Sequence, residues 1–363
     1  MRNDGPFDRR ATGPDGGVAP ITVEGVRKSL GGIERLGPID LSIAPGEVTA
    51  LMGPNGAGKT VLLACLAGGL QPDDGTVLID PDDRFDPQTA TDEENKWIDR
   101  TAMAYAPQGS MALPGLTGRE TIDFYTSLHP AATDRWRELV EAFGIESVLD
   151  ELVRTYSGGM TQLLELAIVL SIDASVYLLD EPTAALDMAA IRRLHAAIYD
   201  RIEAGATVLC TSHVPADIEL ADRIVFLREG SIVADGTVEQ LWETLPPIVR
   251  RADLGRSDEP PVLGGRWMRH ADGLCGFLPP DVETDAPTIE PTPGDLFEYY
   301  TSIRPASEAS GGVNIDDRSS RSTDDRPSRS TADRSSRSTA DRPSNVSRSD
   351  GRIIETDPSG GVR

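Results

Sequence analysis

The sequence predicts an α/β fold in which a mostly parallel sheet is flanked by helices. Apolar runs with the length of strands occur at Val48 to Met52, Val176 to Leu179 and Thr207 to Thr211. The second run is continuously apolar, as in strands that a parallel sheet buries on both faces. Helical patterns such as Met188 to Ala204 lie between the runs. This alternation of strands and helices favours a parallel sheet.

The first strands are expected to form an antiparallel β subdomain. Residues 1–20 are rich in Gly, Pro and Asp, which predicts a flexible arm. From there the pattern becomes globular, because Ile21 to Val23 and Ile39 to Ile43 alternate as strands do. A further strand is expected at Thr76 to Ile79. The acidic stretch from Asp80 to Asp99 that follows is expected to be an exposed excursion.

The turn after Val48 to Met52 has the sequence Gly53-Pro54-Asn55-Gly56-Ala57-Gly58-Lys59-Thr60, which matches G-x-x-x-x-G-K-[ST] between a strand and a helix. Its glycines let backbone N–H groups turn inward and form, with the helix N-terminus, a concave site for phosphate oxygens. Lys59 then places a charge on the β- and γ-phosphates, and the Thr60 hydroxyl is placed to ligate Mg²⁺. A purely structural glycine turn is the alternative, but eight matched positions in this context favour nucleotide binding.

A helical insertion is predicted in the middle of the chain. After a short strand at Met103 to Ala106, several short amphipathic helices are expected from Thr117 to Thr155. Ser157-Gly158-Gly159 then opens a strongly apolar helix, Met160 to Ile172. We expect these helices to form a subdomain over about residues 110–172.

Two adjacent carboxylates, Asp180 and Glu181, end the buried strand that begins at Val176. They lie at the edge where α/β sheets bind ligands. There Asp180 would hold Mg²⁺ through water, whereas Glu181, pointing the other way, could polarise the attacking water as a general base. One carboxylate at a strand end is commonly a structural cap, but two in this order and spacing favour chemistry.

The stretch Ser157-Gly158-Gly159-Met160-Thr161-Gln162 provides a second anion site, made of a serine hydroxyl and unobstructed N–H groups at a helix N-terminus. One γ-phosphate does not need two distant sites from one subunit. We therefore expect the second site to close over a nucleotide bound to another copy of the chain.

The last elements of the main domain are a helix after Pro215 and a strand pair at Arg223 to Leu227 and Ser231 to Ala234. Residues 21–243 are therefore expected to form one domain. The remainder of the chain is expected to have two parts, because its composition changes near residue 305.

Residues 244–304 are expected to be a small extension. Paired strands are predicted at Arg266 to Met268 and Gly276 to Leu278, and a capped short helix at Thr292 to Tyr300. Residues 305–363 degenerate into an eight-residue repeat of Asp, Arg and Ser with almost no apolar residue. Because such a segment cannot bury a core, we expect a disordered tail.

The order of these motifs resembles that of an ATP-binding-cassette (ABC) ATPase subunit over roughly residues 21–243. The matches are the Walker A loop Gly53 to Thr60, Gln108 in the Q-loop, Ser157 to Gln162 as the signature, Asp180 and Glu181 as Walker B with its catalytic glutamate, Ala185-Leu186-Asp187 as the D-loop and His213 as the switch histidine. The resemblance implies a P-loop NTPase core with a mostly parallel sheet, an antiparallel β subdomain and a helical signature subdomain.

The resemblance also implies ligands and partners. Two cassettes would sandwich two ATP molecules head to tail, so the expected partners are a second ATPase subunit, in a homodimer, and an integral membrane permease on a separate chain. Glu181, His213 and Gln108 would be catalytic, and Thr60, Gln108 and Asp180 would bind Mg²⁺. The nucleotide would be bound by Leu30, Gly53, Pro54, Asn55, Gly56, Ala57, Gly58, Lys59, Thr60, Val61, Ser157, Gly158, Gly159 and Asp187.

The sequence departs from the family at three places. Leu30 stands where an aromatic residue usually stacks on adenine, although an apolar side chain can still pack on the base. Tyr156 replaces the usual Leu at the start of the signature, and Leu163-Leu164 replaces the usual basic pair after it. The run Tyr156 to Met160, together with Pro293 to Phe297, resembles the subgroup that works with ABC-2-type permeases, mostly exporters.

Composition restricts the class of partner. With 59 Asp and Glu against 35 Lys and Arg, the net charge is −24, so sequence-independent nucleic-acid binding loses its electrostatic driving force and no nucleic acid is expected. We interpret the charge as adaptation to a high-salt cytoplasm, in a halophilic organism; an ordinary acidic protein is the alternative. Three scattered cysteines indicate a reducing compartment. The first twenty residues lack a signal-peptide pattern, and no apolar run approaches the ~20 residues that span a bilayer.

The expected function is an ATP-hydrolysing subunit that dimerises on ATP and drives a permease for export, peripheral on the cytoplasmic face of the cell membrane. The alternative is a soluble ABC ATPase that acts on DNA or ribosomes, which the short helical insertion without heptads and the single cassette disfavour. A degenerate nucleotide-binding regulator is disfavoured because Lys59, Glu181 and His213 are all present. Cargo specificity is expected to lie in the permease.

Overall fold

The computed structural model describes residues 20–79, 96–98, 100–251, 260–270 and 273–304. The chain divides into two units, residues 1–317 and 318–363, and every described residue belongs to the first. The predicted flexible arm, the excursion from Asp80 to Asp99 and the repeat tail lie outside the described residues, apart from Pro20 and Lys96 to Ile98.

The helices and strands are, in chain order, β1 (Ile21–Leu30), β2 (Ile33–Ile43), β3 (Val48–Met52), α1 (Lys59–Leu66), β4 (Asp74–Ile79), β5 (Lys96–Ile98), β6 (Met103–Ala106), α2 (Gly118–Leu128), α3 (Trp136–Phe143), α4 (Gly158–Leu170), β7 (Val176–Asp180), α5 (Met188–Glu203), β8 (Thr207–Ser212), β9 (Arg223–Arg228), β10 (Ser231–Thr237), α6 (Val238–Glu243), β11 (Ile248–Arg250), β12 (Met268–His270), β13 (Gly273–Phe277), β14 (Thr288–Ile289) and α7 (Pro293–Glu298).

The N-terminal strands form a sheet in the order β2-β1-β4-β5, in which β1 pairs antiparallel with both β2 and β4. The predicted antiparallel β subdomain is therefore confirmed. Strand β1 is longer than its alternating run suggested, because Gly31 and Gly32, both with positive φ, form a two-residue hairpin turn. This turn places Leu30 opposite Ile33.

Six strands form the central sheet in the order β10-β9-β3-β8-β7-β6. Strands β9, β3, β8, β7 and β6 run parallel, and β10 is an antiparallel edge strand. Every residue of β3, β7 and β8 is buried, which explains why these strands are largely apolar instead of alternating. The predicted α/β fold with a mostly parallel sheet is confirmed.

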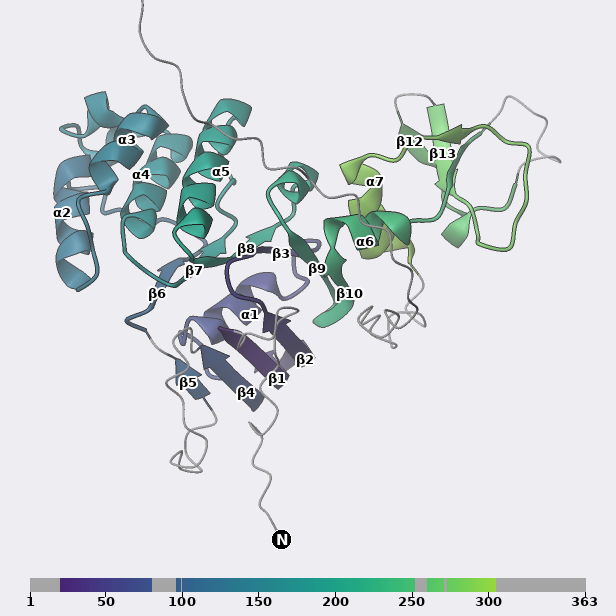
Figure 1. Ribbon diagram of the computed structural model, residues 1–363, viewed down its shortest axis with the longest axis horizontal. Coiled ribbons are helices and arrows are strands. Elements are labelled where there is room, and N and C mark those ends of the chain that lie inside the picture. Colours follow the sequence, from purple (N-terminus) through teal and green to yellow (C-terminus); the bar gives the residue numbers. More distant parts are fainter. Residues whose placement is uncertain (1–19, 80–95, 99, 252–259, 271–272, 305–363) are drawn as a thin grey trace, which may run out of the picture. The chain divides into compact units, whose positions relative to one another are not determined.

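The central sheet separates two hydrophobic cores, because successive residues of a strand point to opposite faces. In β7, Tyr177 and Leu179 belong to the core that contains α3, α4 and α5. Val176 and Leu178 belong to the other core, which contains α1 and the N-terminal sheet. Helices α1 and α4 therefore cover opposite faces of the sheet, as Figure 1 shows.

Helices α2 and α3 both pack on α4 as the predicted helical subdomain, and α3 and α4 also contact α5 (Figure 1). Helix α2 begins at a capping box made by Thr117 and Glu120. Helix α4 begins at Gly158, two residues before the predicted Met160, because the Ser157 hydroxyl accepts a hydrogen bond from the Met160 N–H at 3.2 Å. Within the described residues, no helix has the length and apolarity needed to cross a membrane.

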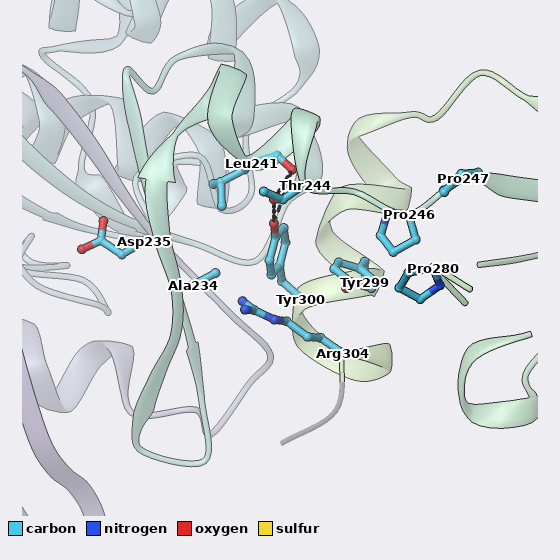
Figure 2. A pocket seen from close by; sticks show the side chains of 10 residues that line it. All are labelled: Ala234, Asp235, Leu241, Thr244, Pro246, Pro247, Pro280, Tyr299, Tyr300 and Arg304. Carbon is cyan, nitrogen blue, oxygen red and sulfur yellow. Dashed lines mark hydrogen bonds between the residues drawn. The ribbon is translucent and has the colours of Figure 1, made fainter. Parts of the chain in front are cut away.

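The extension after α6 buries aromatic side chains against the central sheet. The Tyr300 ring stacks on Phe226 of β9, with 4.8 Å between the ring centroids, and its hydroxyl lies 2.6 Å from the Thr244 hydroxyl. A pocket of about 310 Å³ lies at this junction. Figure 2 shows that residues of β10, α6 and the end of the extension at Arg304 line it. None of its lining residues comes from the phosphate loop.

Short elements depart most from the sequence predictions. The strand pair predicted at Arg266 to Met268 and Gly276 to Leu278 forms instead between β12 and β13, with Met268 opposite Cys275. The helix predicted after Pro215 is a single 3₁₀ segment, Pro215–Glu219, and α6 and β11 were not predicted. The reason is length, since segments of three to six residues show no measurable periodicity.

Because Tyr300 is 2% exposed and packs on Phe226, Tyr300→Ala is expected to lower the free energy of unfolding by about 3–5 kcal/mol. Tyr300→Phe keeps the ring, removes only the hydroxyl and should cost about 1 kcal/mol. Urea denaturation measures both values. The loss should appear in the main transition, since the extension shares the core of the sheet, and a separate early transition for the extension would contradict this.

Candidate nucleotide-binding site

The phosphate loop (Gly53–Thr60) connects β3 to α1, and two of its glycines are required by packing. Gly53 has a φ of 156°, and a Cβ there would clash with the carbonyl oxygen of Leu227. Gly58 has a φ of 108°, and a Cβ there would lie 2.7 Å from Leu36 Cδ2. No side chain caps α1, and no acidic residue lies in its first turn. No side chain of that turn therefore competes with an anion at the helix N-terminus.

Lys59 is buried under the loop that precedes it, with 5% of its side chain exposed. Its Nζ donates to the carbonyl oxygens of Gly53 at 2.8 Å and Pro54 at 3.3 Å, and lies 4.0 Å from Glu181 Oε1. Burial lowers the pKa of Lys59, and the carboxylates of Glu181 and Asp180 oppose this shift. The lysine charge is thus held between the loop and the two acids that end β7.

Asp180 ends β7 as a buried carboxylate. Its Oδ1 accepts hydrogen bonds from Thr211 Oγ1 at 2.6 Å and Thr60 Oγ1 at 3.3 Å. Its Oδ2 is buried and has no hydrogen-bond partner among the described residues. Burial raises the pKa of the Asp180 carboxyl, and the hydrogen bonds from Thr211 and Thr60 limit that shift.

Each side-chain oxygen of Glu181 contacts a different residue of the cluster. Its Oε1 lies 3.1 Å from His213 Nδ1, and its Oε2 accepts a hydrogen bond from Gln108 Nε2 at 3.2 Å. The residue has a φ of 51°, which is strained for a non-glycine residue. Its backbone N–H is fixed by a 2.8 Å hydrogen bond to Thr211 Oγ1. One threonine therefore holds the side chain of Asp180 and the backbone of Glu181 together.

The structure brings six of the predicted residues to one edge of the sheet: Lys59, Thr60, Gln108, Asp180, Glu181 and His213. They come from the first turn of α1, the ends of β7 and β8, and the segment after β6. These elements meet because the carboxyl ends of parallel strands lie at the same edge of a sheet.

The residues present suit a Mg²⁺ site. Thr60 Oγ1 lies 3.3 Å from both Gln108 Oε1 and Asp180 Oδ1. The second oxygen of Asp180 is a buried acceptor that lacks a donor among the described residues. Hydroxyl, amide and carboxylate oxygens are the ligands that Mg²⁺ prefers, and one or two carboxylates are the usual number.

The signature residues lie apart from this cluster. Ser157 is exposed and caps α4, and Gly159 lies so close to Ala185 that a Cβ there would be 2.9 Å from the Ala185 carbonyl oxygen. Asp187 caps α5 by accepting a hydrogen bond from the Ala190 N–H at 2.7 Å. Among the described residues, no hydrogen bond or ion pair joins Ser157 or Asp187 to the phosphate loop. The two predicted anion sites are therefore not brought together within one chain.

Leu30 lies at the end of the β1–β2 hairpin, where it is 38% exposed and faces the 56% exposed Ile33. Farther along β2, Arg35 and Leu36 approach Gly58 of the phosphate loop. The hairpin thus extends from the loop to an apolar tip. Ile33, which sequence reasoning did not select, has the same aliphatic character as Leu30 and contributes to this tip.

Thr211 is another residue that sequence reasoning missed. In the sequence it stands out only as the last residue of a predicted strand, although it contacts Asp180 and Glu181. The signal that could have identified it is strand register, because in a parallel β7–β8 pair Asp180 stands opposite Thr211. Register is not visible in a single sequence without knowledge of which strands are neighbours.

Comparison with known proteins identifies relatives over most of the described region. The family profile described as ABC transporter matches residues 36–184. The chain is 32% identical over 240 residues to the daunorubicin/doxorubicin resistance ATP-binding protein DrrA of Streptomyces peucetius, covering 64% of this chain and 70% of that protein. It is 33% identical over 226 residues to the daunorubicin resistance ATP-binding protein DrrA3 of Streptomyces coeruleorubidus, covering 61% and 69%.

Solved structures share the fold. A dimeric post-hydrolysis state of an ATP-binding cassette, bound to ADP and Pi, matches with a TM-score of 0.52 at 23% identity, covering 60% of this chain and 98% of that chain. An ATP-binding subunit of an ABC transporter matches with a TM-score of 0.53 at 23% identity, covering 61% and 92%. The cassette fold that the motif order implied is thereby confirmed.

Removal of the Thr211 hydroxyl should disturb the positions of Asp180 and Glu181, because both residues are hydrogen-bonded to it. Thr211→Val keeps the side-chain shape, but Asp180 Oδ1 then loses its 2.6 Å donor in β8, and the pKa of Asp180 should rise further. Since the ionised form is needed to bind Mg²⁺, we expect about a 10-fold lower rate of ATP hydrolysis and an acidic limb displaced to higher pH. Steady-state kinetics against pH and Mg²⁺ concentration measure both effects.

Thr207→Val is the matched control, because Thr207 begins the same strand and accepts a hydrogen bond from the Gly46 N–H at 3.0 Å, at the opposite edge of the sheet. It should leave the pH profile in place. An equal displacement in both variants would show that the effect of Thr211→Val is a general loss of stability.

Proposed function

This chain belongs to the ATP-binding-cassette family of ATPases, and from that membership we propose that it is the ATPase subunit of an ABC exporter. In this proposal two copies close head to tail over two ATP molecules, and the closure drives a separate membrane permease. The subunit then works in the cytoplasm, at the cytoplasmic face of the membrane. The relatives named for resistance to daunorubicin and doxorubicin support export as the direction.

The separation of the two anion sites carries the dimer proposal. The phosphate loop opens α1 on one face of the central sheet, whereas Ser157 opens α4 on the other. Five parallel strands of the central sheet lie between the two cores. A signature with an exposed serine and glycine at a helix N-terminus can therefore reach a γ-phosphate only on another molecule.

Contacts of the clustered residues suggest their roles. Glu181 would act as the general base, with its two oxygens oriented by His213 and Gln108. Lys59 would bind the β- and γ-phosphates, and His213 would contact the γ-phosphate. Thr60, Gln108 and Asp180 would hold Mg²⁺, which when bound neutralises charge on the phosphates. Leu30 and Ile33 would pack on the base.

A patch of exposed apolar side chains supports the permease as partner. Leu113, Phe124 and Leu128 are 44%, 43% and 65% exposed and lie on α2 and the segment before it. The buried carboxylate of Glu165 on α4 accepts hydrogen bonds from Ser110 Oγ and the Ala112 N–H, both at 2.7 Å. The segment between Gln108 and the patch is thus hydrogen-bonded to the signature helix. In this proposal, a partner that binds the patch responds to changes at the nucleotide site through that segment.

The alternative, a soluble ABC ATPase that acts on DNA or ribosomes, has less support. The chain carries a net charge of −24, which opposes contact with a polyanion. Helices α2 and α3, of eleven and eight residues, are too short for the long coiled coil that would reach along nucleic acid.

In the first test of this function, Glu181→Gln should bind ATP but hydrolyse it about 10²- to 10⁴-fold more slowly, since the amide cannot accept the proton of the attacking water. The trapped nucleotide should hold two copies together. ATPase assays and size-exclusion chromatography with ATP measure the two effects. Unchanged turnover in this variant would contradict the role given to Glu181.

Chains that carry Glu181→Gln can also show which copy supplies the phosphate loop and which supplies the signature. With Glu181→Gln present in both, Lys59→Ala chains keep an intact signature and Ser157→Arg chains keep an intact loop. Only a mixture can assemble a complete site, so labelled ATP should be retained by the mixture and by neither variant alone. Retention by Ser157→Arg alone would contradict the head-to-tail arrangement.

Charge on the apolar patch should uncouple the subunit from its permease. Phe124→Asp with Leu128→Asp is expected to reduce the fraction that sediments with native membranes at least several-fold, because a desolvated carboxylate opposes docking. ATP trapping by the purified subunit should be unchanged. Leu274→Asp, at a 38% exposed leucine of β13, is the control. Sedimentation with ribosomes or DNA in place of membranes would favour the alternative function.

A further inference from the structure

A second cluster of buried side chains includes close sequence neighbours of Glu181 and His213. Its centre is Asp217, in the 3₁₀ segment Pro215–Glu219, which is 2% exposed. Asp217 Oδ2 accepts hydrogen bonds from Thr183 Oγ1 at 2.6 Å and Ser212 Oγ at 2.5 Å. Asp217 Oδ1 lies 3.6 Å from His195 Nε2. One carboxylate thus contacts side chains from three other segments of the chain.

Two of these segments carry the catalytic residues. Ser212 immediately precedes His213, and Thr183 follows Glu181 by two residues. Ser212 Oγ also accepts a hydrogen bond from the Val214 N–H at 2.9 Å. The residues on both sides of His213 are therefore fixed to the buried cluster, while the His213 side chain, 40% exposed, reaches Glu181.

The third segment connects the cluster to the expected dimer interface. His195 lies on α5, whose first turn is capped by Asp187 of the D-loop. At 1.5 Å per residue, the two positions are roughly 12 Å apart along the helix. Asp217 is thus close to a helix that begins where a second copy is proposed to approach.

The charge of Asp217 is stabilised in place. Burial raises the pKa of the Asp217 carboxyl, whereas the neighbouring His195 and the hydroxyls of Ser212 and Thr183 lower it. The lowering effects together are larger, so the pKa lies below its ordinary value. An ionised carboxylate makes shorter and stronger hydrogen bonds than a neutral group. Its partners are therefore held more tightly than neutral contacts would hold them.

We infer that Asp217 is a positioning residue for ATP hydrolysis, which fixes the turn that carries His213 against the segment that follows Glu181. The inference rests on the proposed catalytic roles of those two residues. Asp217 does not touch the phosphate loop. It acts through His213, by setting the backbone on either side of it, so its loss should slow the chemical step without weakening the binding of ATP.

Asp217→Asn in the full chain is the primary test, because it keeps the size of the side chain and removes the charge. We expect kcat to fall about 10-fold with the KM for ATP unchanged within about twofold. Asp295→Asn is the matched control. Asp295 is 7% exposed, accepts from Thr292 Oγ1 at 2.6 Å and lies 3.6 Å from His270 Nε2, but it belongs to the extension. It should change neither constant.

A double-mutant cycle separates positioning from simple loss of stability. If Asp217 acts through His213, then adding Asp217→Asn to His213→Ala should lower kcat by less than about twofold. An equal fall of kcat in both backgrounds overturns the inference. So does a result in which Asp217→Asn and Asp295→Asn change kcat and KM to the same extent. Should Asp217→Asn fold poorly, Ser212→Ala removes one donor only and should show the same dependence on His213.

The role of Asp217 and the proposed catalytic roles of Glu181 and His213 are contradicted by different results. If Glu181→Gln and His213→Ala strongly reduce turnover while Asp217→Asn and Ser212→Ala leave kcat unchanged, the inference fails and the ATPase assignment stands. If Glu181→Gln retains full turnover, the proposed catalytic roles fail first.

Discussion

In the central sheet, β7 and β8 run parallel in a register that places Asp180 opposite Thr211. This pairing decides the geometry of the site, because Thr211 donates to the Asp180 side chain and accepts from the Glu181 backbone. A slip of one residue would turn Asp180 to the opposite face and remove the support of the strained φ at Glu181. The register is held because both strands are buried on both faces. The packing of the core therefore also fixes the positions of Asp180 and Glu181.

The same sheet places the phosphate loop and the signature on different faces of the domain. A doubly covered sheet must place helices on both faces, and here α1 takes the phosphate loop to one face while α4 takes the signature to the other. Neither helix can move across the buried strands. In the proposed head-to-tail dimer, the partner copy would complete each site. Within one chain, the hydrogen bond from the Ala112 N–H to Glu165 joins the segment after Gln108 to the signature helix.

Long or chemically marked elements were predictable from the sequence. Val48 to Met52 forms a strand with the predicted bounds, and the phosphate loop, Asp180, Glu181, Gln108 and His213 meet at one edge as their motif order implied. Asp217 was not predictable, because its partners lie up to 34 residues away and none belongs to a recognisable pattern with it. Short elements such as β12 and α6 were misplaced or missed because their formation is decided by packing on neighbours, not by their own periodicity.

Charge balance at the edge of the sheet accounts for the expected need for a metal. Lys59 is one cation facing two carboxylates, so the cluster of Lys59, Asp180 and Glu181 is net negative before any phosphate is present. A triphosphate would add further negative charge in a partly buried site, where screening is weak. Among the described residues there is no group of three His, Cys, Asp or Glu side chains able to hold a metal ion without help. A single buried carboxylate with a hydroxyl and an amide oxygen suits a Mg²⁺ ion that takes its remaining ligands from phosphate and water. Metal and nucleotide should therefore bind as one unit, each reducing the electrostatic cost of the other.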